Sequence, residues 1–338
     1  MRAGWRGRRS TGLRRVTGWA AVAVAGMLAL VACGGSSGGS NAPVKQGTSS
    51  SSASALCQTK GSGNVTVGAF NFSESQLLAT IYAAALQQCG YTTSVKQLGA
   101  RDVVYPALTA GQIDVVPEYA ATLTTYINGK KNGPNAQSPA AGDIDTTMQA
   151  LRKLLPTSLV ALDPAPATDK DAFAVTETFA KQHNLTSLSD LATYSKQHPV
   201  SVGGPPECPQ RPYCLQGLKS TYGIQVSKFV PLDAGGPLTI AAIKDGKVDV
   251  GEVFTSDPTV TAQGLVVLDD DKNLQLSDNI VPIVNTKVAG AALKSALNAV
   301  DQKLTEDALV QMNKAVQVQH AKPEQVAQQF LQQSGLLG

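Results

Sequence analysis

The sequence predicts an α/β protein built as two lobes, and three observations lead to this fold class. Short β-rich runs alternate with helical patterns along most of the 338-residue chain, which is typical of strands covered by helices. About 275 residues follow a Gly- and Ser-rich segment, more than one simple core accommodates. A short pattern also recurs in both halves of the chain. We therefore expect two α/β units of similar design.

The first unit opens with a β-rich run at 65–70, followed by a helical apolar stripe that Cys89 and Gly90 end. Ser73, with Gln76 three residues later, predicts a capping box at the start of this helix. We then expect a strand at 93–98, a helix at 101–109 and a short strand at 113–116. This spacing predicts parallel strands.

The same alternation resumes after residue 170. We expect strands at 200–202 and 228–232, helices at 215–222 and 237–244, and a helical tail over 291–331. Thr305 and Pro323 mark the starts of two helices in this tail.

The recurring pattern is Gly-x-hydrophobic-Asp-Val, at 111–115 and again at 246–250, an offset of 135 residues. The same offset pairs Tyr119 with Phe254, and Thr122 with Asp257. Open α/β sheets bind ligands just beyond the carboxyl ends of their strands. The repeat therefore predicts two aromatic side chains that face each other across a cleft. The alternative is that the pattern is merely a common helix–strand turn.

The N-terminal segment has the layout of an export signal. Six arginines and no acid precede an apolar run that ends in Leu30-Val31-Ala32-Cys33. This ending resembles a bacterial lipobox, so residues 1–32 are expected to be a signal peptide and Cys33 a lipidation site. An ordinary signal peptide or a membrane span are the alternatives, but the run is short of the ~20 residues that a spanning helix needs. Paired arginines leave a twin-arginine export route open.

Residues 33–63 are predicted to form a flexible, lipid-anchored tether, because Gly, Ser, Ala, Asn and Thr dominate the segment. Without the six signal arginines, the 28 basic residues fall to 22 against 25 acidic ones, so the net charge becomes about −3 instead of +3. No basic stripe with interleaved aromatics is present in the sequence. Nucleic-acid binding is therefore not expected.

Four cysteines follow the tether, namely Cys57, Cys89, Cys208 and Cys214. An even number in an exported protein favours disulfides, and three pairings are possible. Spacing favours Cys57 with Cys89 and Cys208 with Cys214. No C-x-x-C pair is present and the chain has only 3 histidines, so we expect no zinc site, no other metal and no cofactor.

Several motifs in order make the chain similar to the substrate-binding proteins of osmoprotectant ABC importers. This is the glycine betaine/carnitine/choline family, of the ProX and OpuC type. The motifs lie at 71–74, 114–119, 211–212, 249–257, 267–272 and 282–284, and the resemblance covers about 64–331.

The resemblance implies a two-lobed periplasmic-binding-protein-like fold of type II, with ligand in the interlobe cleft. Lobe I would comprise 64–168 plus 281–338, and lobe II 169–280. The protein would be a monomer outside the cell membrane. It would deliver a small osmoprotectant to a membrane permease that works with a cytoplasmic ATPase.

The resemblance also implies a ligand site, in which tyrosines surround a trimethylammonium group. Tyr119 matches one cage tyrosine, and Phe254 takes the place of a second. Aspartates stand at two further cage positions, and Phe70 replaces a lysine common in the family. Arg211 matches an arginine that holds the ligand carboxylate. The expected site comprises Asn71, Phe72, Arg101, Tyr119, Thr122, Asp169, Asp171, Arg211, Phe254, Thr255 and Asp278.

The aspartates leave two alternatives open. They accept hydrogen bonds as well as hold cations, so a hydroxylated, amine-bearing or aromatic ligand is an alternative to a quaternary amine. One or more of them could instead cap helices or face water, Asp278 above all. A tethered sensor or interaction protein is a further alternative. The sequence contains no nucleophile–base motif or phosphate-binding loop, so we expect no enzyme.

Overall fold

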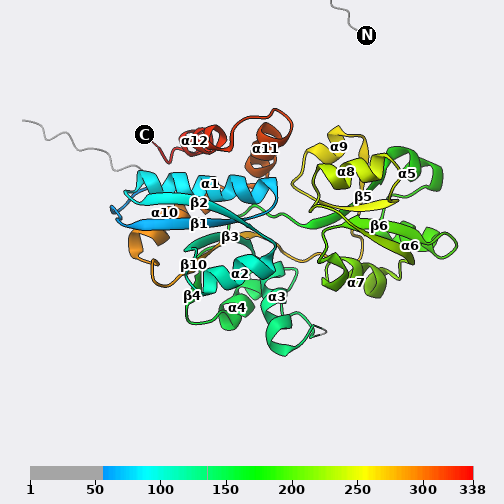
Figure 1. Cartoon of the computed structure of the whole chain (residues 1–338), viewed down its shortest axis with the longest axis horizontal. Coiled ribbons are helices and arrows are strands. Elements are labelled where there is room, and N and C mark those ends of the chain that lie inside the picture. Colours follow the sequence, from blue (N-terminus) through cyan, green and yellow to red (C-terminus); the bar gives the residue numbers. More distant parts are fainter. Residues whose placement is uncertain (1–55, 135, 338) are drawn as a thin grey trace, which may run out of the picture. The chain divides into compact units, whose positions relative to one another are not determined.

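The computed structural model describes residues 56–134 and 136–337 (Figure 1). The predicted signal peptide, the lipidation site Cys33 and most of the predicted tether lie outside the described residues. Two five-stranded sheets form the framework of the described part. We refer to the part built on the first sheet as lobe I and to the part built on the second as lobe II.

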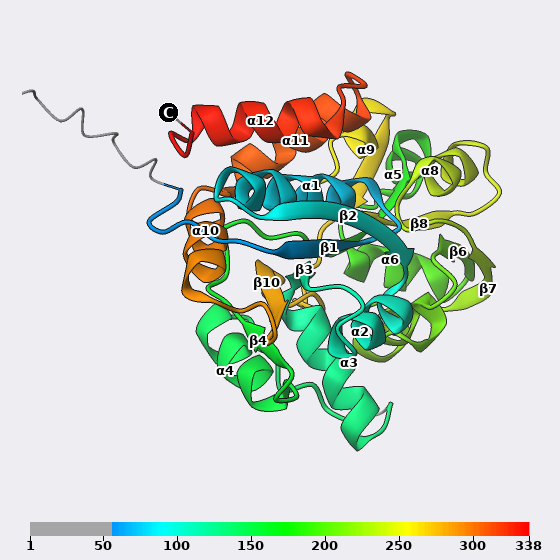
Figure 2. The ribbon, with the colours of Figure 1, turned by 60° about the vertical axis from the view of Figure 1, so that its left-hand side comes forward.

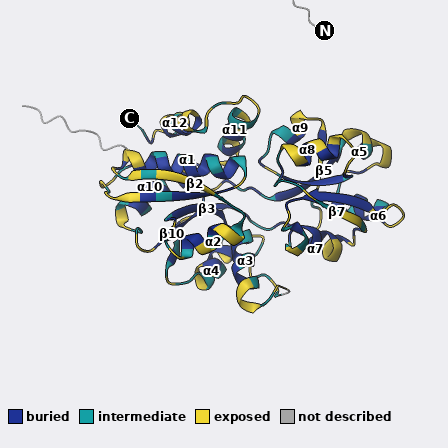
Figure 3. Cartoon of the chain, in the orientation of Figure 1, coloured by how far each residue is buried: buried dark blue, intermediate teal, exposed yellow. Residues whose placement is uncertain are grey.

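The sheet of lobe I contains strands from both ends of the described chain. In spatial order they are β2 (Thr92–Gly99), β1 (Asn64–Phe70), β3 (Val115–Tyr119), β10 (Ile280–Asn285) and β4 (Leu159–Ala161). β3 and β10 are buried throughout, whereas the edge strand β2 is largely exposed (Figure 3). Strands covered on both faces need continuous apolar runs, which explains the Val- and Ile-rich sequence of β10.

The sheet of lobe II is formed by one continuous stretch of chain. In spatial order its strands are β7 (Val226–Pro231), β6 (Val200–Gly204), β8 (Val250–Phe254), β5 (Asp171–Thr176) and β9 (Leu265–Leu268). The predicted first lobe boundary at 168/169 falls between β4 and β5, and β10 begins at Ile280, next to the predicted second boundary at 280/281. The exact boundaries stay a prediction.

The prediction of parallel sheets was wrong for part of each lobe. β1 runs parallel to β2 and β3, and β6 runs parallel to β7 and β8. β10 is antiparallel to β3 and β4, and β5 is antiparallel to β8 and β9. β5 and β10 each follow a crossing between the lobes. No βαβ connection within one lobe fixes their direction.

Helices cover both faces of each sheet, with α1, α11 and α12 on one face of the sheet in lobe I and α2, α3 and α4 on the other (Figures 1 and 2). Those of lobe I are α1 (Ser73–Gln88), α2 (Arg101–Thr109), α3 (Ala120–Asn132), α4 (Ile144–Leu154), α10 (Ala291–Asp301), α11 (Glu306–Gln317) and α12 (Pro323–Gln333). Those of lobe II are α5 (Glu177–His183), α6 (Leu188–Ser195), η1 (Cys208–Gln210), α7 (Leu215–Gly217), η2 (Leu218–Tyr222), α8 (Pro237–Lys244) and α9 (Thr259–Ala262).

The capping box predicted at Ser73 is absent, because Ser73 is the first helical residue of α1 and Phe72 is the N-cap, without a side-chain hydrogen bond. The serine that does bond near this turn is Ser75, whose hydroxyl accepts a hydrogen bond from the backbone N–H of Phe70 at 2.9 Å. This bond fixes the turn between β1 and α1. Thr305, by contrast, caps α11 as predicted, by accepting from the N–H of Ala308.

The sequence repeat is confirmed as a structural repeat, since β3 and β8 occupy equivalent places in the two sheets. Each strand follows a glycine with positive φ, +71° at Gly111 and +66° at Gly246, a conformation that favours glycine. Each is preceded by an aspartate that bonds the neighbouring strand. Asp114 accepts from the backbone N–H of Thr66 in β1 at 2.8 Å, and Asp249 accepts from that of Ser201 in β6 at 2.7 Å.

Both predicted disulfides are confirmed, namely Cys57–Cys89 and Cys208–Cys214. The first ties the segment before β1 to the C-cap of α1. The second joins two cysteines that are 6 positions apart, and Arg211 lies in the loop between them.

Candidate functional site

A cleft between the lobes collects most of the side chains that the sequence singled out. The space between its walls amounts to about 510 Å³, a volume that includes open solvent. Its lining consists of Phe70, Asn71, Phe72, Ala100, Arg101, Tyr119, Thr122, Asp169, Asp171, Glu207, Arg211, Ala234, Phe254 and Asp278. Phe70, Tyr119 and Phe254 are the last residues of β1, β3 and β8. The cleft therefore lies where strand ends of both sheets meet, as open α/β sheets require of a ligand site.

Four aromatic rings form one wall of the cleft, and Phe72 is the centre of this aromatic wall. Its ring centroid lies 5.8 Å from that of Phe70, 6.1 Å from that of Tyr119 and 5.2 Å from that of Phe254. Phe72 thus joins the two strand-end aromatics of lobe I to that of lobe II. Faces of such rings attract a cation.

Arg101 lines the cleft, but its guanidinium is already paired. Nε donates to Glu118 Oε1 at 3.1 Å, and the terminal NH2 group donates to Glu118 Oε2 at 2.9 Å. The guanidinium carbon also lies 5.0 Å from the centroid of the Phe70 ring. Because Glu118 is buried in β3, this bidentate pair fixes Arg101 at the cleft wall.

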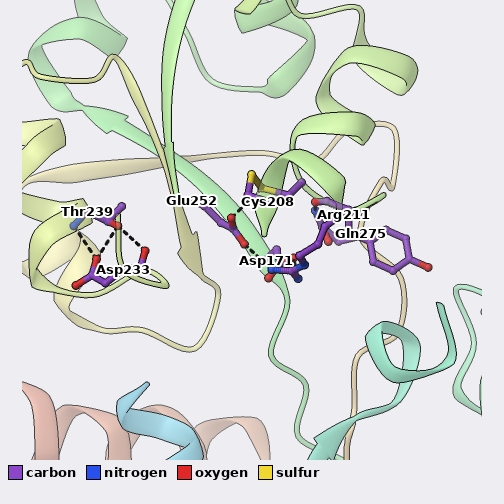
Figure 4. The surroundings of a disulfide bond; sticks show 9 residues. Asp171, Cys208, Arg211, Asp233, Thr239, Glu252 and Gln275 are labelled. Carbon is purple, nitrogen blue, oxygen red and sulfur yellow. Dashed lines mark hydrogen bonds and ion pairs between the residues drawn. A yellow bond between two sulfur atoms is a disulfide. The ribbon is translucent and has the colours of Figure 1, made fainter. Parts of the chain in front are cut away.

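Arg211 is also paired, but to two different carboxyl groups of lobe II (Figure 4). One NH group donates to Asp171, and the other donates to Glu252 Oε1 at 3.0 Å. Glu252 is fully buried, and its other carboxyl oxygen lies 2.8 Å from Sγ of Cys214. Burial raises the pKa of Glu252 well above its usual range, and the charge of Asp171 adds to this shift. The disulfide loop thus presents Arg211 to the cleft.

Asp278 lines the cleft and also caps a helix. The prediction of a ligand-site residue and the alternative of a helix cap therefore do not exclude each other. Its Oδ1 accepts hydrogen bonds from the backbone N–H groups of Ala121 at 2.8 Å and Thr122 at 3.0 Å, at the start of α3. The hydroxyl of Thr122 donates to Oδ2. Burial raises the pKa of Asp278 to about 6, against the opposing effect of the Thr122 bonds.

Asp169 lies in the crossing between the lobes and is buried. It accepts a hydrogen bond from the N–H of Ser256 at 3.2 Å. Burial raises its pKa well above the usual range, and the nearby charge of Glu74 raises it further. Thr255 is the one predicted site residue that is not in the cleft lining. Its hydroxyl instead accepts from the N–H of Lys170 at 3.0 Å.

Sequence reasoning missed part of the lining, since Phe70 was noted only as a substitution and Ala100, Glu207 and Ala234 were not considered. It also missed Glu118 and Glu252, the partners of the two arginines. Phe70 could have been found by the strand-end rule that found Tyr119. A single acid inside an otherwise apolar strand was the available signal for both glutamates, because buried charges are usually paired.

The cleft carries more acids than bases, with two arginines against four carboxyl groups in its lining. Both arginines already bond carboxylates of the chain itself. This balance favours a ligand with a positive group. Within the described residues, the one cluster of metal-binding atom types is Cys208, Cys214 and Glu252, and its sulfurs are joined in a disulfide.

Comparisons with known proteins agree with this geometry. Residues 63–333 match the family described as the substrate binding domain of the ABC-type glycine betaine transport system. The glycine betaine-binding protein YehZ of Escherichia coli K12 is 28% identical over 284 residues, covering 80% of this chain and 90% of that protein. A glycine-betaine-binding protein of Pseudomonas aeruginosa PAO1 is 26% identical over 284 residues, covering 80% and 88%.

A solved structure of a glycine betaine/carnitine/choline ABC transporter protein superposes with a TM-score of 0.60, at 22% identity. The match covers 80% of this chain and 99% of that one. At this identity the likeness concerns the fold, and it confirms the predicted α/β architecture of type II binding proteins.

Proposed function

Because the chain belongs to the family of substrate-binding domains of ABC-type glycine betaine transport systems, we propose that the solute it captures for its importer is glycine betaine. Capture and delivery of a small solute is the role of the family. The choice of glycine betaine is supported by the printed names of the relatives in E. coli and P. aeruginosa. We assign the protein no catalytic role.

The observation that carries the proposal is the aromatic wall beside a surplus of carboxylates. A trimethylammonium group cannot donate hydrogen bonds, so it is held by ring faces and by nearby negative charge. Tyr119 and Phe254 offer such faces from the two lobes, next to Asp171 and Asp278.

The opposite end of the ligand requires donors. Arg211 would share its guanidinium between the ligand carboxylate and its partner Asp171. Asn71 lines the cleft and is exposed, so its amide is available to the ligand. Thr122 would contribute less, because its hydroxyl already donates to Asp278.

Members of this family work outside the cytoplasmic membrane with an ABC permease. We propose that Cys33 carries a lipid anchor, that the segment 33–63 tethers a monomeric binding domain, and that the permease is coupled to a cytoplasmic ATPase. In the described part of the chain, no helix has the length and apolar character needed to span a bilayer.

Titration with glycine betaine tests the proposal directly. We expect binding by calorimetry and a raised melting temperature, and we expect Phe254→Ala to weaken affinity about 30-fold, as loss of a desolvated cation–π contact of about 2 kcal/mol implies. Phe229→Ala, which removes a half-buried ring of lobe II outside the cleft lining, is the matched control. Binding of carnitine, choline or proline betaine alone would reassign the solute, and binding of none would refute the proposal.

The affinity is expected to fall as the pH drops through about 6. The quaternary ammonium does not titrate, whereas Asp278, with a pKa of about 6, loses its charge there. The charge of Arg101 lowers the pKa of Asp278 and the charge of Asp171 raises it, and the charge of Asp278 in turn acts on Arg211. The sign for folding is opposite, because a carboxyl with a raised pKa stabilises the fold at low pH and loses that contribution as the pH rises through about 6.

Calorimetry between pH 5 and 8 measures this dependence, with Asp278→Asn as the comparison. The amide oxygen can still accept from the start of α3, so the cap is kept while the charge is removed. We expect weaker binding and a flatter pH profile from this variant. An unchanged profile would mean that another carboxyl controls the dependence.

A further inference from the structure

Glu74 stands behind the aromatic wall and holds one of its rings. It lies in the first turn of α1, with 3% of its surface exposed, and it is not part of the cleft lining. Its Oε1 accepts a hydrogen bond from the hydroxyl of Tyr119 at 2.7 Å. The hydroxyl of this strand-end tyrosine is therefore used inside the protein, and only its ring faces the cleft.

The other carboxylate oxygen of Glu74 reaches lobe II. Oε2 accepts from the hydroxyl of Ser256 at 2.5 Å and from the amide of Asn313 at 2.6 Å. Ser256 follows β8 of lobe II, and Asn313 belongs to α11 of lobe I. One side chain thus connects a ring of the cleft, the end of a lobe II strand and a C-terminal helix.

Two further hydrogen bonds hold Ser256 beside this carboxylate. The N–H of Ser256 donates to Asp169 at 3.2 Å, and the amide of Asn313 donates to the carbonyl of Ser256 at 3.3 Å. Burial raises the pKa of Glu74, against the effect of its three donors. A buried carboxylate that accepts three hydrogen bonds is costly to separate from any of them.

We propose that Glu74 is a positioning residue that couples ligand binding to contact between the lobes. It fixes the ring of Tyr119 against the ligand, and the same carboxylate accepts the Ser256 hydroxyl when lobe II lies against lobe I. A ligand that requires the fixed ring thereby favours the contact, and the contact slows release of the ligand. The assignment rests on the proposed function for its ligand and on the geometry for its coupling.

The sharpest variants remove one hydrogen bond each and leave the cleft wall in place. Tyr119→Phe keeps the ring but removes the donor to Glu74, and Ser256→Ala removes the donor from lobe II. Each is expected to weaken glycine betaine binding about 5- to 20-fold, mainly through faster dissociation in stopped-flow measurements. In the double variant, the fold-loss of affinity is expected to be at most about twice that of the weaker-binding single variant. The two losses should not multiply, because both donors act through one carboxylate. Ser227→Ala, an exposed serine of lobe II, is the control.

Glu74 itself is tested by two replacements. Glu74→Gln keeps an acceptor for Tyr119 but places an amide group where Oε2 accepts from Ser256 and Asn313. We therefore expect Glu74→Gln to lose affinity to the extent of Ser256→Ala, and Glu74→Ala to lose it to the extent of the double variant. Binding within twofold of the native protein for both Tyr119→Phe and Ser256→Ala, or multiplicative losses in the double variant, would overturn the proposal.

A measurement without ligand separates this proposal from the proposed function. Small-angle X-ray scattering of the ligand-free protein is expected to give a larger radius of gyration for Ser256→Ala and Glu74→Ala than for the native protein and Ser227→Ala. If the native protein bound no glycine betaine, the proposed function would fail, and the scattering would still decide the coupling. Equal radii for all four proteins would overturn it.

Discussion

Replacing Arg211 with alanine is expected to reduce glycine betaine binding at least 100-fold and to lower the free energy of unfolding by about 3 kcal/mol. The binding loss follows from removal of the only lobe II arginine in the cleft lining of the described chain. The stability loss follows because Glu252 and Asp171, 0% and 7% exposed at their side chains, are left without their cation. Breaking a buried pair costs about 3–5 kcal/mol, and we take the low end because Arg211 is 22% exposed.

Calorimetry measures the binding, and urea unfolding measures the stability. Arg211→Ala combined with Glu252→Gln separates the two effects, because removal of the orphaned carboxyl should restore much of the stability without restoring affinity. Arg211→Lys is expected to be intermediate, since one ammonium cannot reproduce the fork that bonds both carboxylates. Affinity within fivefold of the native value in Arg211→Ala would remove this residue from the site.

Loss of either disulfide is expected to lower the free energy of unfolding, but loss of only one of them should also weaken ligand binding. Cys57→Ser with Cys89→Ser opens a link between residues 32 positions apart, which corresponds to about 4 kcal/mol of unfolding free energy from loop closure. Cys208→Ser with Cys214→Ser opens a link over 6 positions, which corresponds to about 2 kcal/mol. The shorter loop carries Arg211, so only its opening should also weaken ligand affinity, by about tenfold or more.

Urea unfolding and calorimetry on the two double variants check this division. Tyr213 strengthens the expectation, since this residue of the shorter loop shares a hydrogen bond with Thr125 of lobe I at 2.7 Å. An affinity loss caused by opening Cys57–Cys89 alone would show that the N-terminal link also shapes the cleft.

Local signals in the sequence were sufficient for many elements of the fold. The bounds of α2 and α8 agree with the predicted 101–109 and 237–244, because a glycine or a proline marks a boundary of each. The direction of β5 and β10 was not predictable from such signals. It depends on how the chain crosses between lobes, and no pattern of period 2 or 3.6 encodes a crossing.

The candidate site was predictable to the extent that it lies at strand ends. Tyr119 and Phe254 follow from the repeat, and the cleft brings them together with Phe72. The pairing of the arginines could not be predicted, because Arg211 lies in the disulfide loop and Glu252 in β8, 41 residues apart in the sequence. Whether each of these residues binds ligand stays a prediction.

The order of strands in the two sheets has a consequence for how the chain folds during synthesis. The sheet of lobe II is complete once the segment from Asp171 to Leu268 has emerged. The sheet of lobe I needs β10, and its helix α1 packs against α12 near the other end of the chain. Synthesis of lobe I therefore begins first, but its sheet can be completed only after lobe II has had time to fold. Until then the apolar faces of β1 and α1 lack the packing that β10 and α12 supply.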